Sequence, residues 1–556
     1  MRPGSNHPLD GARPDALLES VAVLVDPRDD VAVARVPLAA GTRLRAAGDV
    51  LTLSSPVAPK HKFAIRFLPA GAAVHMYGAP VGVAARPIAP GEPLTQENLS
   101  DRTAHHARPD PHTRPAPLEP PCPMPHFLGI DRGPGGVGTR NHLLVAYTVP
   151  CAAGAAARVV AACRRAFGFD QGDAETRYAR SLAFPRETPG AVEPTSQGPV
   201  PFPGVDDIVL LHHDSGCGMP DHGDLESFGR WLAHYLRHPN VGGALLLGLG
   251  CEKANIAWLE ERYLHAMRRE CGKPIETLQH QAVGTEAALV RQGIQRVHAL
   301  LQRVHSVRRV PVPLSRLVLG TKCGGSDGFS GISANPALGW VSDRVAGAGG
   351  AVLLPEVPEM YGAEHLLAAR AVHPDVAERV FALVRRYADL AALSNVRLAE
   401  NPSQGNIADG LVTIQMKSLG AVRKAGSGPI AGVLEYGEWA PGPGVWLLDT
   451  PGYDVASTAA LPASGATLIC FTTGLGTPFG NPVVPVVKVS SNTPLFHHMP
   501  DVIDFDAGTV VRGEETVAQC GARLLETLLA VASGARTRGE ENGHREAAFW
   551  RRQCNL

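Results

Sequence analysis

The amino-acid sequence predicts an α/β protein in which a small all-β domain precedes two α/β lobes with mostly parallel sheets. The chain of 556 residues is longer than one hydrophobic core usually accommodates, so several domains are expected. Near the N-terminus, apolar and polar residues alternate with a period of two, which is typical of half-buried strands. Further along, short apolar runs alternate with amphipathic segments, which is typical of parallel strands joined by helices.

The all-β domain is expected over residues 15–103, where stretches such as "VAVARV" and "VGVAARPI" show the strand-like alternation. The segments "VPLAAGTRL" and "RPIAPGEPLTQENL" resemble two copies of one turn. Residues 104–126 are dense in Pro and His and have no periodicity, so they are interpreted as an extended linker.

The two α/β lobes are expected over residues 127–310 and 311–535. Their strands are predicted at the apolar runs 207–213, 243–250, 316–321, 350–356, 444–450 and 466–473, and their helices at 223–238, 255–269, 374–394 and 513–532. The charged tail, residues 536–556, is expected to be a partly ordered appendage.

Composition excludes several classes of protein. The formal net charge of −1 provides no basic surface for nucleic acid or for anionic membranes. No apolar run approaches the roughly 18 residues of a membrane span, and the first residues lack the apolar core of a signal peptide. We therefore expect a cytoplasmic protein, with a homodimer as the prior for a chain of this size. The ten cysteines form no CxxC pair, which argues against a zinc ribbon and a disulfide framework.

Three short motifs do not fit known nucleotide or hydrolase sites. "GPGGVG" (133–138) matches the dinucleotide fingerprint but precedes a strand-like run, so a tight turn is favoured. "CGGSDG" lacks the Lys-Ser/Thr of a phosphate-binding loop. "HDSGCG" lacks the glycine pattern of a nucleophile elbow.

Chemically active residue types follow four of the predicted strands. Ligands in open parallel sheets bind at the carboxyl ends of strands, so these segments are the candidate site. They are "HHDSGCGMPDHG" from 212, "CEK" from 251, "CGGSDGFSG" from 323 and "PEVPEMYGAEH" from 355, and "NPSQGN" (401–406) adds two amides.

Three cysteines at these strand ends, Cys217, Cys251 and Cys323, each neighbour a glycine. Considered jointly, they favour a shared metal site over three separate packing residues. Cysteine, histidine and carboxylate suit iron(II), manganese(II) or zinc(II). An iron–sulfur cluster with Cys151 or Cys470 as a fourth ligand stays open as an alternative.

Many blocks of the chain, in order, resemble the altronate and galactarate dehydratase family. They include "GVGTRNHLLVAYTVPC", "GLGCE", "CGGSDGFSGISANPALG", "PEMYGAEHLLAARA", "NPSQGNIADGL", "KSLGA", "DTPGYD" and "ICFTTGLGTPFG". The N-terminal region, with "HKFA" at 61–64, resembles the SAF-like (β-clip) domain of that family. The family also includes large subunits of sulfolactate sulfo-lyases.

The resemblance implies a hydro-lyase that converts a sugar acid, altronate-like or galactarate-like, into a 2-keto-3-deoxy acid. A base removes the C2 proton, and an acid assists loss of the C3 hydroxyl. The resemblance also implies a divalent metal, Fe²⁺ or alternatively Mn²⁺, which would stabilise the enolate-like intermediate.

We expect three groups of site residues. The metal candidates are His213, Cys217, Cys251 and Cys323; the substrate-binding candidates are His61, Lys62, Ser326, Asp327, Asn401 and Asn406; the acid–base or carboxylate-binding candidates are Glu356, Glu359, Tyr361, Glu364, His365 and Lys417. For any one carboxylate, a helix cap or surface ion pair is an equal alternative. For "HKFA", substrate binding by a docked small domain and the mere start of a strand are equal alternatives.

Two positions depart from the family pattern and bear on the substrate. Met416 precedes Lys417 where a Glu is common, and Asp214 makes its loop more charged than usual. A different sugar acid or a smaller hydroxy acid is therefore open. A sulfo-lyase that releases sulfite and a non-catalytic sugar-acid binding protein are the alternatives of other classes.

Overall fold

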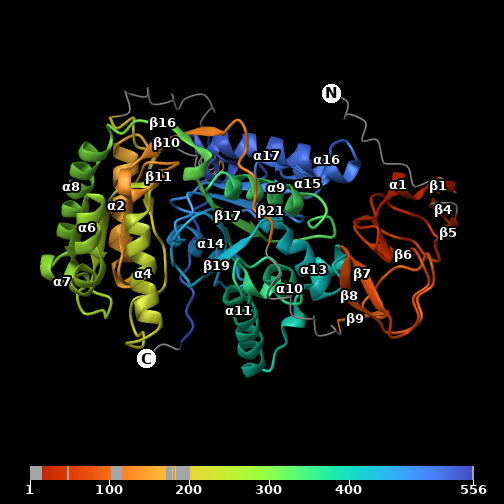
Figure 1. Cartoon of the computed structure of the whole chain (residues 1–556). Coiled ribbons are helices and arrows are strands. Elements are labelled where there is room, and N and C mark those ends of the chain that lie inside the picture. The colour runs from red at the N-terminus through yellow and green to blue at the C-terminus, as the bar shows by residue number, and fades with distance from the viewer. Residues whose placement is uncertain are drawn as a thin grey trace.

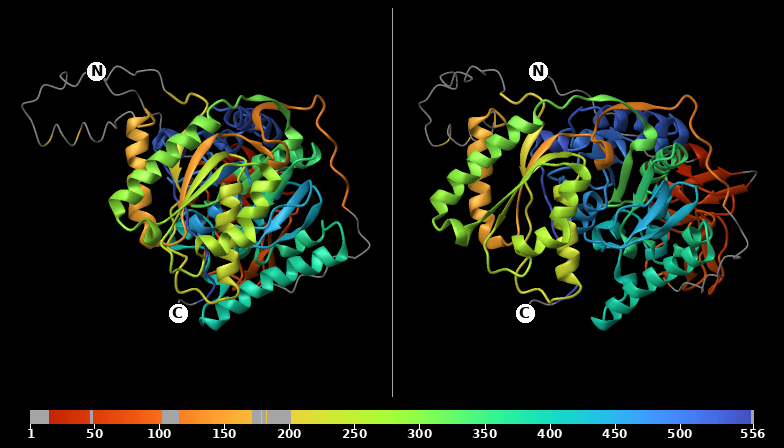
Figure 2. Two further views of the ribbon diagram at one scale, coloured as in Figure 1. Left: turned by 90° about the vertical axis from the view of Figure 1, so that its left-hand side faces the viewer. Right: turned by 60° about the vertical axis from the view of Figure 1, so that its left-hand side comes forward.

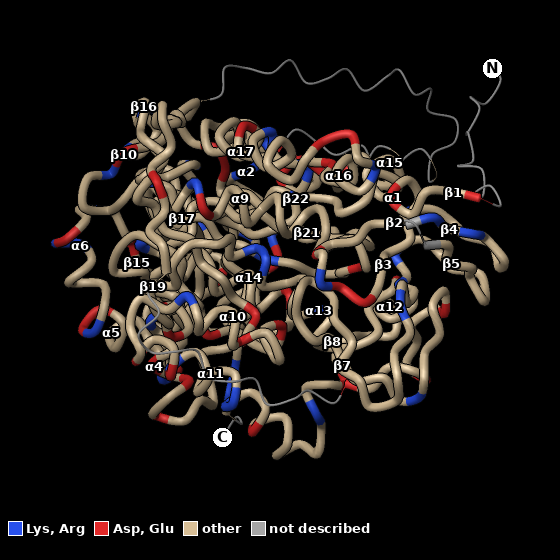
Figure 3. The backbone as a smooth tube through the Cα atoms, turned by 45° about the vertical axis from the view of Figure 1, so that its right-hand side comes forward, with Lys and Arg blue, Asp and Glu red and all other residues tan. Residues whose placement is uncertain are grey.

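The computed structural model of the chain describes residues 15–46, 49–101, 115–170, 178, 182 and 201–553. A small strand-rich domain lies beside two larger α/β lobes (Figure 1). Lys and Arg segments alternate with Asp and Glu segments over the backbone, as expected from the near-zero net charge (Figure 3). Among these described residues, no helix has the length and apolarity that a membrane crossing requires.

The N-terminal domain confirms the predicted all-β module. It contains three three-stranded sheets, with the orders β1-β4-β5, β2-β3-β6 and β7-β8-β9. The strands are β1 (Asp15–Leu17), β2 (Ala22–Val23), β3 (Val31–Ala34), β4 (Arg43–Ala46), β5 (Asp49–Thr52), β6 (Lys62–Ala64), β7 (Ala73–Met76), β8 (Ala79–Ala84) and β9 (Leu99–Ser100), with the short helix α1 (Leu18–Val21). Of the predicted linker, residues 104–114 lie outside the described residues, and 115–125 have no regular structure.

The first lobe is built on a four-stranded parallel sheet of order β13-β12-β14-β15. Its strands are β12 (His142–Tyr147), β13 (Asp207–Leu210), β14 (Val241–Gly248) and β15 (Ile275–Gln279). Helices α2 (Ala153–Ala166) and α8 (Glu286–Val304) pack together on one face, and α4 (Asp224–Arg237) covers the other (Figure 2). Every residue of β12 and β14 is buried, because both faces are covered.

The second lobe is built on a seven-stranded parallel sheet of order β19-β20-β18-β17-β21-β22-β23. Its strands are β17 (Val318–Cys323), β18 (Ala351–Leu354), β19 (Ile430–Leu434), β20 (Gly444–Leu448), β21 (Leu468–Thr473), β22 (Val486–Ser490) and β23 (Phe505–Asp506). Helices α9 (Ala334–Gly347) and α17 (Val517–Ala532) pack on one face, and α14 (Asp454–Ala463) lies toward α4 of the first lobe. One hydrophobic cluster, which includes Trp231 and Phe471, therefore joins the two lobes.

A small sheet of β10 (His126–Asp131), β11 (Val137–Gly138) and β16 (Val310–Pro313) lies at the junction of the lobes. Gly133–Gly135 form a 3-10 turn between β10 and β11, and the next regular element is β12 rather than a helix. The interpretation of "GPGGVG" as a turn is confirmed.

The C-terminal tail packs against both lobes and is not an appendage, so that prediction was wrong. Phe549 is buried against Phe228 and Trp231 of α4 and against Tyr436 of the second lobe. Arg551 pairs with Asp214 at 2.6 Å in the first lobe. The aromatic side chain explains the difference, because the charged composition of the tail conceals an apolar anchor.

Candidate active site

The second sheet has a topological switch point between β17 and β21. These neighbours lead away in opposite directions, to β18 on one side and to β22 on the other. A crevice outside the carboxyl ends of such strands is where open α/β sheets bind ligands. Strand β17 ends at Cys323, where the polar loop follows, and Glu356 follows the end of β18.

A lysine–glutamate cluster lies at these strand ends; we use the name for Lys322, Cys323, Glu356, Lys424 and Asp454. Lys322 binds Glu356 and lies 2.7 Å from Asp454. Lys424 lies 2.9 Å from the other oxygen of Glu356 and 2.8 Å from the sulfur of Cys323. The backbone N–H of Cys323 also donates to Glu356 at 3.1 Å. Both oxygens of Glu356 are thus occupied by protein donors.

The opposite charges of this cluster stabilise one another's ionised forms. Burial alone would raise the pKa of Glu356, but Lys322 and Lys424 lower it below its usual value, so the carboxylate is ionised. Burial opposes the charge of Lys424, yet Cys323 and Glu356 raise its pKa. Burial raises the pKa of the Cys323 thiol, with Glu356 adding to the effect. Glu356 is therefore a counter-ion of two lysines and has no free oxygen for acid–base chemistry.

The small domain docks onto the second lobe through a domain-contact cluster of Lys60, Lys62, Asp327, Asp409 and Gly410. Lys60 bridges Asp409 at 2.7 Å and the fully buried Asp327 at 3.2 Å. Lys62 donates to the carbonyl oxygen of Gly410 at 2.6 Å. A Cβ at Gly410, where φ is +90°, would lie 2.4 Å from the carbonyl oxygen of Lys60. The two domains therefore approach so closely that only glycine fits this position.

Lys62 has an unusual protonation state for a lysine. Burial lowers its pKa to about 7, and Lys60 acts in the same direction while Asp327 and Asp409 oppose it. The small domain docks against the second lobe at this point, but Lys62 binds backbone carbonyls of the protein and begins strand β6, as the alternative interpretation of "HKFA" expects. The neighbouring His61 ring contacts the Ala408 carbonyl at 3.0 Å.

Two of the predicted hydroxyl-binding residues bind protein groups. Asp327 accepts hydrogen bonds from Ser330, Ser491 and Asn492 at 2.8, 2.7 and 3.0 Å. The carbonyl oxygen of Ser326 accepts from the amide of Asn406 at 2.7 Å. These two residues shape the loop after β17.

A glutamate–amide cluster of Glu359, Asn401, Asn406 and Lys417 lies beside that loop. Lys417 lies 3.1 Å from Oε1 of Glu359 and 2.8 Å from the oxygen of Asn401. Asn401 donates to the same Oε1 at 3.0 Å. Among the described residues, Oε2 of Glu359 has no hydrogen-bond partner although it is buried. Structures rarely leave a buried carboxylate oxygen unpaired, so this atom is the best candidate to meet a ligand.

The remaining acid–base candidates are close to this cluster along the chain. Tyr361 follows the short helix η5 (Val357–Met360), and Glu364 and His365 open α10 (Glu364–Ala368). All three are partly buried. In the described part of the chain, Oε2 of Glu364 is also buried without a hydrogen bond. Of the predicted site residues, the structure brings Glu359 and Lys417 together with the two amides.

The four predicted metal residues do not converge. Nε2 of His213 lies 2.7 Å from the Tyr147 carbonyl, and its other ring nitrogen accepts from the Ser215 N–H. Cys217 and Cys251 are exposed in the first lobe, whereas Cys323 is buried beside Lys424. Over the described ranges, no group of three or more His, Cys, Asp or Glu side chains could hold a metal ion. These residues therefore do not fit a resident divalent metal or an iron–sulfur cluster in this conformation.

Comparison with known proteins identifies the family. Three family descriptions match successive parts of the chain: the altronate/galactarate dehydratase SAF domain over residues 20–102, the D-galactarate dehydratase/altronate hydrolase second domain over 129–305, and the D-galactarate/altronate dehydratase C-terminal domain over 314–555. The chain belongs to the altronate/galactarate dehydratase family.

Similar proteins of the family carry dehydratase names. The chain is 34% identical over 544 residues to an altronate dehydratase of Bacillus subtilis (strain 168), covering 96% of this chain and 99% of that protein. It is 35% identical to an altronate dehydratase of Escherichia coli K12, covering 95% and 98%. It is 32% identical to the galactarate dehydratase (L-threo-forming) of Escherichia coli K12, covering 89% of each chain. The resemblance inferred from the sequence blocks is confirmed.

Sequence reasoning missed several functional candidates of this dehydratase-family chain: Lys60, Lys322, Asp409, Lys424 and Asp454. A signal was present for Lys322, because a lysine inside the apolar run before Cys323 is unusual for a buried strand. The role of Lys60 depends on how two domains dock, which local sequence does not reveal.

The two departures from the family pattern lie in different surroundings. Met416 is fully buried in α13 (Ile414–Ala421), one residue before Lys417. Asp214 is exposed and pairs with Arg551 of the tail. Met416 precedes Lys417 of the glutamate–amide cluster, whereas Asp214 follows His213, which lies outside that cluster.

Proposed function

We propose that this protein dehydrates a sugar acid, altronate or galactarate, to a 2-keto-3-deoxy acid at the glutamate–amide cluster. The observation that carries the proposal is the buried Oε2 of Glu359, which meets no hydrogen-bond partner in the described ranges and lies beside a lysine and two amides. Family membership supports dehydration as the reaction class. Amides and a lysine together suit a ligand with several hydroxyls and a carboxylate.

Glu359 is the proposed general base. Lys417 and Asn401 hold its Oε1, which fixes the side chain and leaves Oε2 directed to the ligand. A positioned base of this kind typically contributes 10²–10⁴-fold to the rate of proton abstraction. The C2 proton of the sugar acid moves to Oε2 as the enolate-like intermediate forms.

Glu364 is the proposed general acid for loss of the C3 hydroxyl. Its Oε2 is buried without a hydrogen bond within the described ranges, whereas both oxygens of Glu356 bind lysine or backbone donors. Glu364 therefore has a free oxygen for a leaving hydroxyl and Glu356 does not.

Lys417 and the two amides complete the proposed site. The Lys417 ammonium group places a positive charge beside the substrate carboxylate, where negative charge develops after C2 proton loss. Asn401 and Asn406 are assigned to the substrate hydroxyls. The small domain, held by Lys60, covers the loop after β17 and limits access of water.

A requirement for Fe²⁺ or Mn²⁺ remains an expectation from the family resemblance, and no step above uses a metal. Metal analysis after anaerobic purification and activity with and without a chelator test it. We also keep two further expectations as proposals: a cytoplasmic location, which cell fractionation tests, and a homodimer, which sedimentation measurements test.

The experiment is an assay of aldonates, aldarates and sulfolactate that records both 2-keto acid and sulfite. We expect one sugar acid to give a 2-keto-3-deoxy acid, with no sulfite from any substrate. Absence of turnover with every sugar acid, or release of sulfite, would overturn the proposal.

A further inference from the structure

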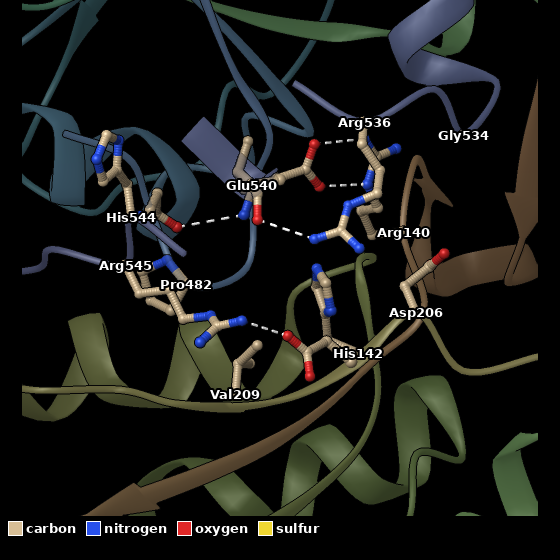
Figure 4. A pocket seen from close by; sticks show the side chains of 13 residues that line it. Arg140, His142, Asp206, Val209, Pro482, Gly534, Arg536, Glu540, His544 and Arg545 are labelled. Atoms are coloured by element: carbon tan, nitrogen blue, oxygen red, sulfur yellow. Dashed lines mark hydrogen bonds and ion pairs between the residues drawn. The ribbon is translucent and has the colours of Figure 1, made fainter. Parts of the chain in front are cut away.

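A cavity at the amino ends of the first sheet is not used by the proposed reaction. Its volume is about 60 Å³, whereas one water needs roughly 10–15 Å³. It lies between β12 and β13 of the first lobe, the loop around Asn481 and the C-terminal tail (Figure 4). We call it the anion cavity, for the reasons that follow.

His142 points into the cavity between two arginines of the tail. Figure 4 shows its ring directed toward the guanidinium group of Arg536, with Arg545 beside it. His142 is 7% exposed, and in the described part of the chain its Nδ1 has no hydrogen-bond partner. A buried, unpaired ring nitrogen that faces a cavity indicates a polar occupant.

The arginines around the cavity exceed their carboxylate partners. Three guanidinium groups (Arg140, Arg536 and Arg545) and three carboxylates (Asp206, Asp207 and Glu540) line the cavity. Arg164 and Arg309 pair with Asp207 and Asp206 from outside the lining, so the whole ion-pair network has a surplus of two positive charges. Glu540 binds Arg140 at 2.7 Å, while Arg164 and Arg545 share Asp207.

Arg536 is the cation that lacks a counter-ion. Its only hydrogen bond within the described ranges goes to the carbonyl oxygen of Glu540 at 2.8 Å, and no carboxylate there pairs with it. Burial lowers the pKa of the neighbouring Arg545, and the charges of Arg164 and Arg536 lower it further although Asp207 opposes them. An anion in the cavity would relieve this repulsion.

Water is the simplest alternative occupant. Water would satisfy His142 but would not balance the surplus charge, whereas an oxyanion would do both. Guanidinium groups present paired donors that match the oxygens of phosphate or carboxylate groups.

We propose that the anion cavity binds a small oxyanion through His142, Arg536 and Arg545. The bound ion would connect the first lobe to the C-terminal tail and would stabilise the packing of the tail. Inorganic phosphate and a small carboxylate share this chemistry, and the experiment distinguishes them.

The test is thermal unfolding of the full chain against increasing phosphate or acetate, with chloride keeping the ionic strength constant. The variant is Arg536→Gln, which is exposed and therefore compatible with folding. The matched control is Arg538→Gln, an exposed arginine two positions away that pairs with Glu541 at 2.9 Å. Anions that bind elsewhere affect both variants alike.

We expect saturable stabilisation by one of the two anions in the wild type and in Arg538→Gln. In Arg536→Gln the apparent Kd should rise at least tenfold, while the basal dehydratase activity stays unchanged. The effective anion identifies the ligand class. The proposal is overturned if neither anion stabilises the protein saturably, or if Arg536→Gln responds like the control.

Discussion

The carboxyl edges of the two parallel sheets carry similar residue types in different surroundings. At the first sheet, His213 is engaged by backbone groups, and Cys217 and Cys251 are exposed. At the second sheet, Cys323 is buried beside Lys424, and a neighbouring domain inserts Lys60 into the loop. Reactive residue types at strand ends therefore show only which edge of a sheet could bind a ligand. Buried charged groups and the contact with a neighbouring domain distinguish the second sheet as the candidate site.

The largest expected effect is on catalysis by Glu359→Gln. Removing the proposed base should lower kcat by about 10²–10⁴-fold, because the amide cannot accept the C2 proton. Steady-state kinetics of 2-keto acid formation measure the change in kcat, and circular dichroism checks that the variant is folded like the wild type. Activity within tenfold of wild type would remove Glu359 from this role.

Glu356→Gln should instead act on stability. Two buried lysines would lose their shared counter-ion, and breaking a buried ion pair typically costs about 3–5 kcal/mol. Urea unfolding measures the change. An unfolding free energy equal to that of wild type would contradict the assigned role of the lysine–glutamate cluster.

Lys60→Gln tests whether domain docking matters to the site. The buried Asp327 would lose its cationic partner, so we expect kcat/KM to fall by roughly tenfold or more. Lys253→Gln is the matched control, because Lys253 pairs with Asp221 at 2.6 Å on the exposed edge of the first lobe. Equal kinetics of the two variants would show that docking is irrelevant to catalysis.

The lowered pKa of Lys62 predicts how stability depends on pH. Between pH 7 and about 10.5, the unfolded chain binds a proton at this lysine that the folded chain does not, so stability rises with pH in that window. The rise is at most about 1.4 kcal/mol per pH unit. Urea unfolding at pH 7.5, 8.5 and 9.5 should show a shallower slope for Lys62→Met, and an unchanged slope would refute the assignment.

The smallest effect is expected at the first sheet. The double variant Cys217→Ser/Cys251→Ser should retain kcat within about twofold, because both thiols are exposed and lie outside the proposed site. A large loss of activity or of bound metal in this variant would restore the metal site that the sequence predicts.

Much of the fold follows from the sequence because burial leaves a direct pattern. The apolar runs that contain Leu210, Leu246 and Leu353 are the buried strands β13, β14 and β18, since parallel strands covered on both faces contain almost only apolar residues. The tail was missed because Phe549 anchors it within an otherwise charged segment.

The candidate site was predictable only in part. Glu359 and Lys417 are distant along the chain, and the family blocks brought both into the candidate set. Lys60 and Lys424 were not found, because their partners depend on tertiary packing between separate segments.

The most direct test of the account is a crystal structure of Glu359→Gln with a bound sugar acid. The account predicts the ligand beside Asn401, Asn406 and Lys417, with its C2 facing residue 359. A ligand bound beside Cys217 and Cys251 of the first lobe would contradict the account.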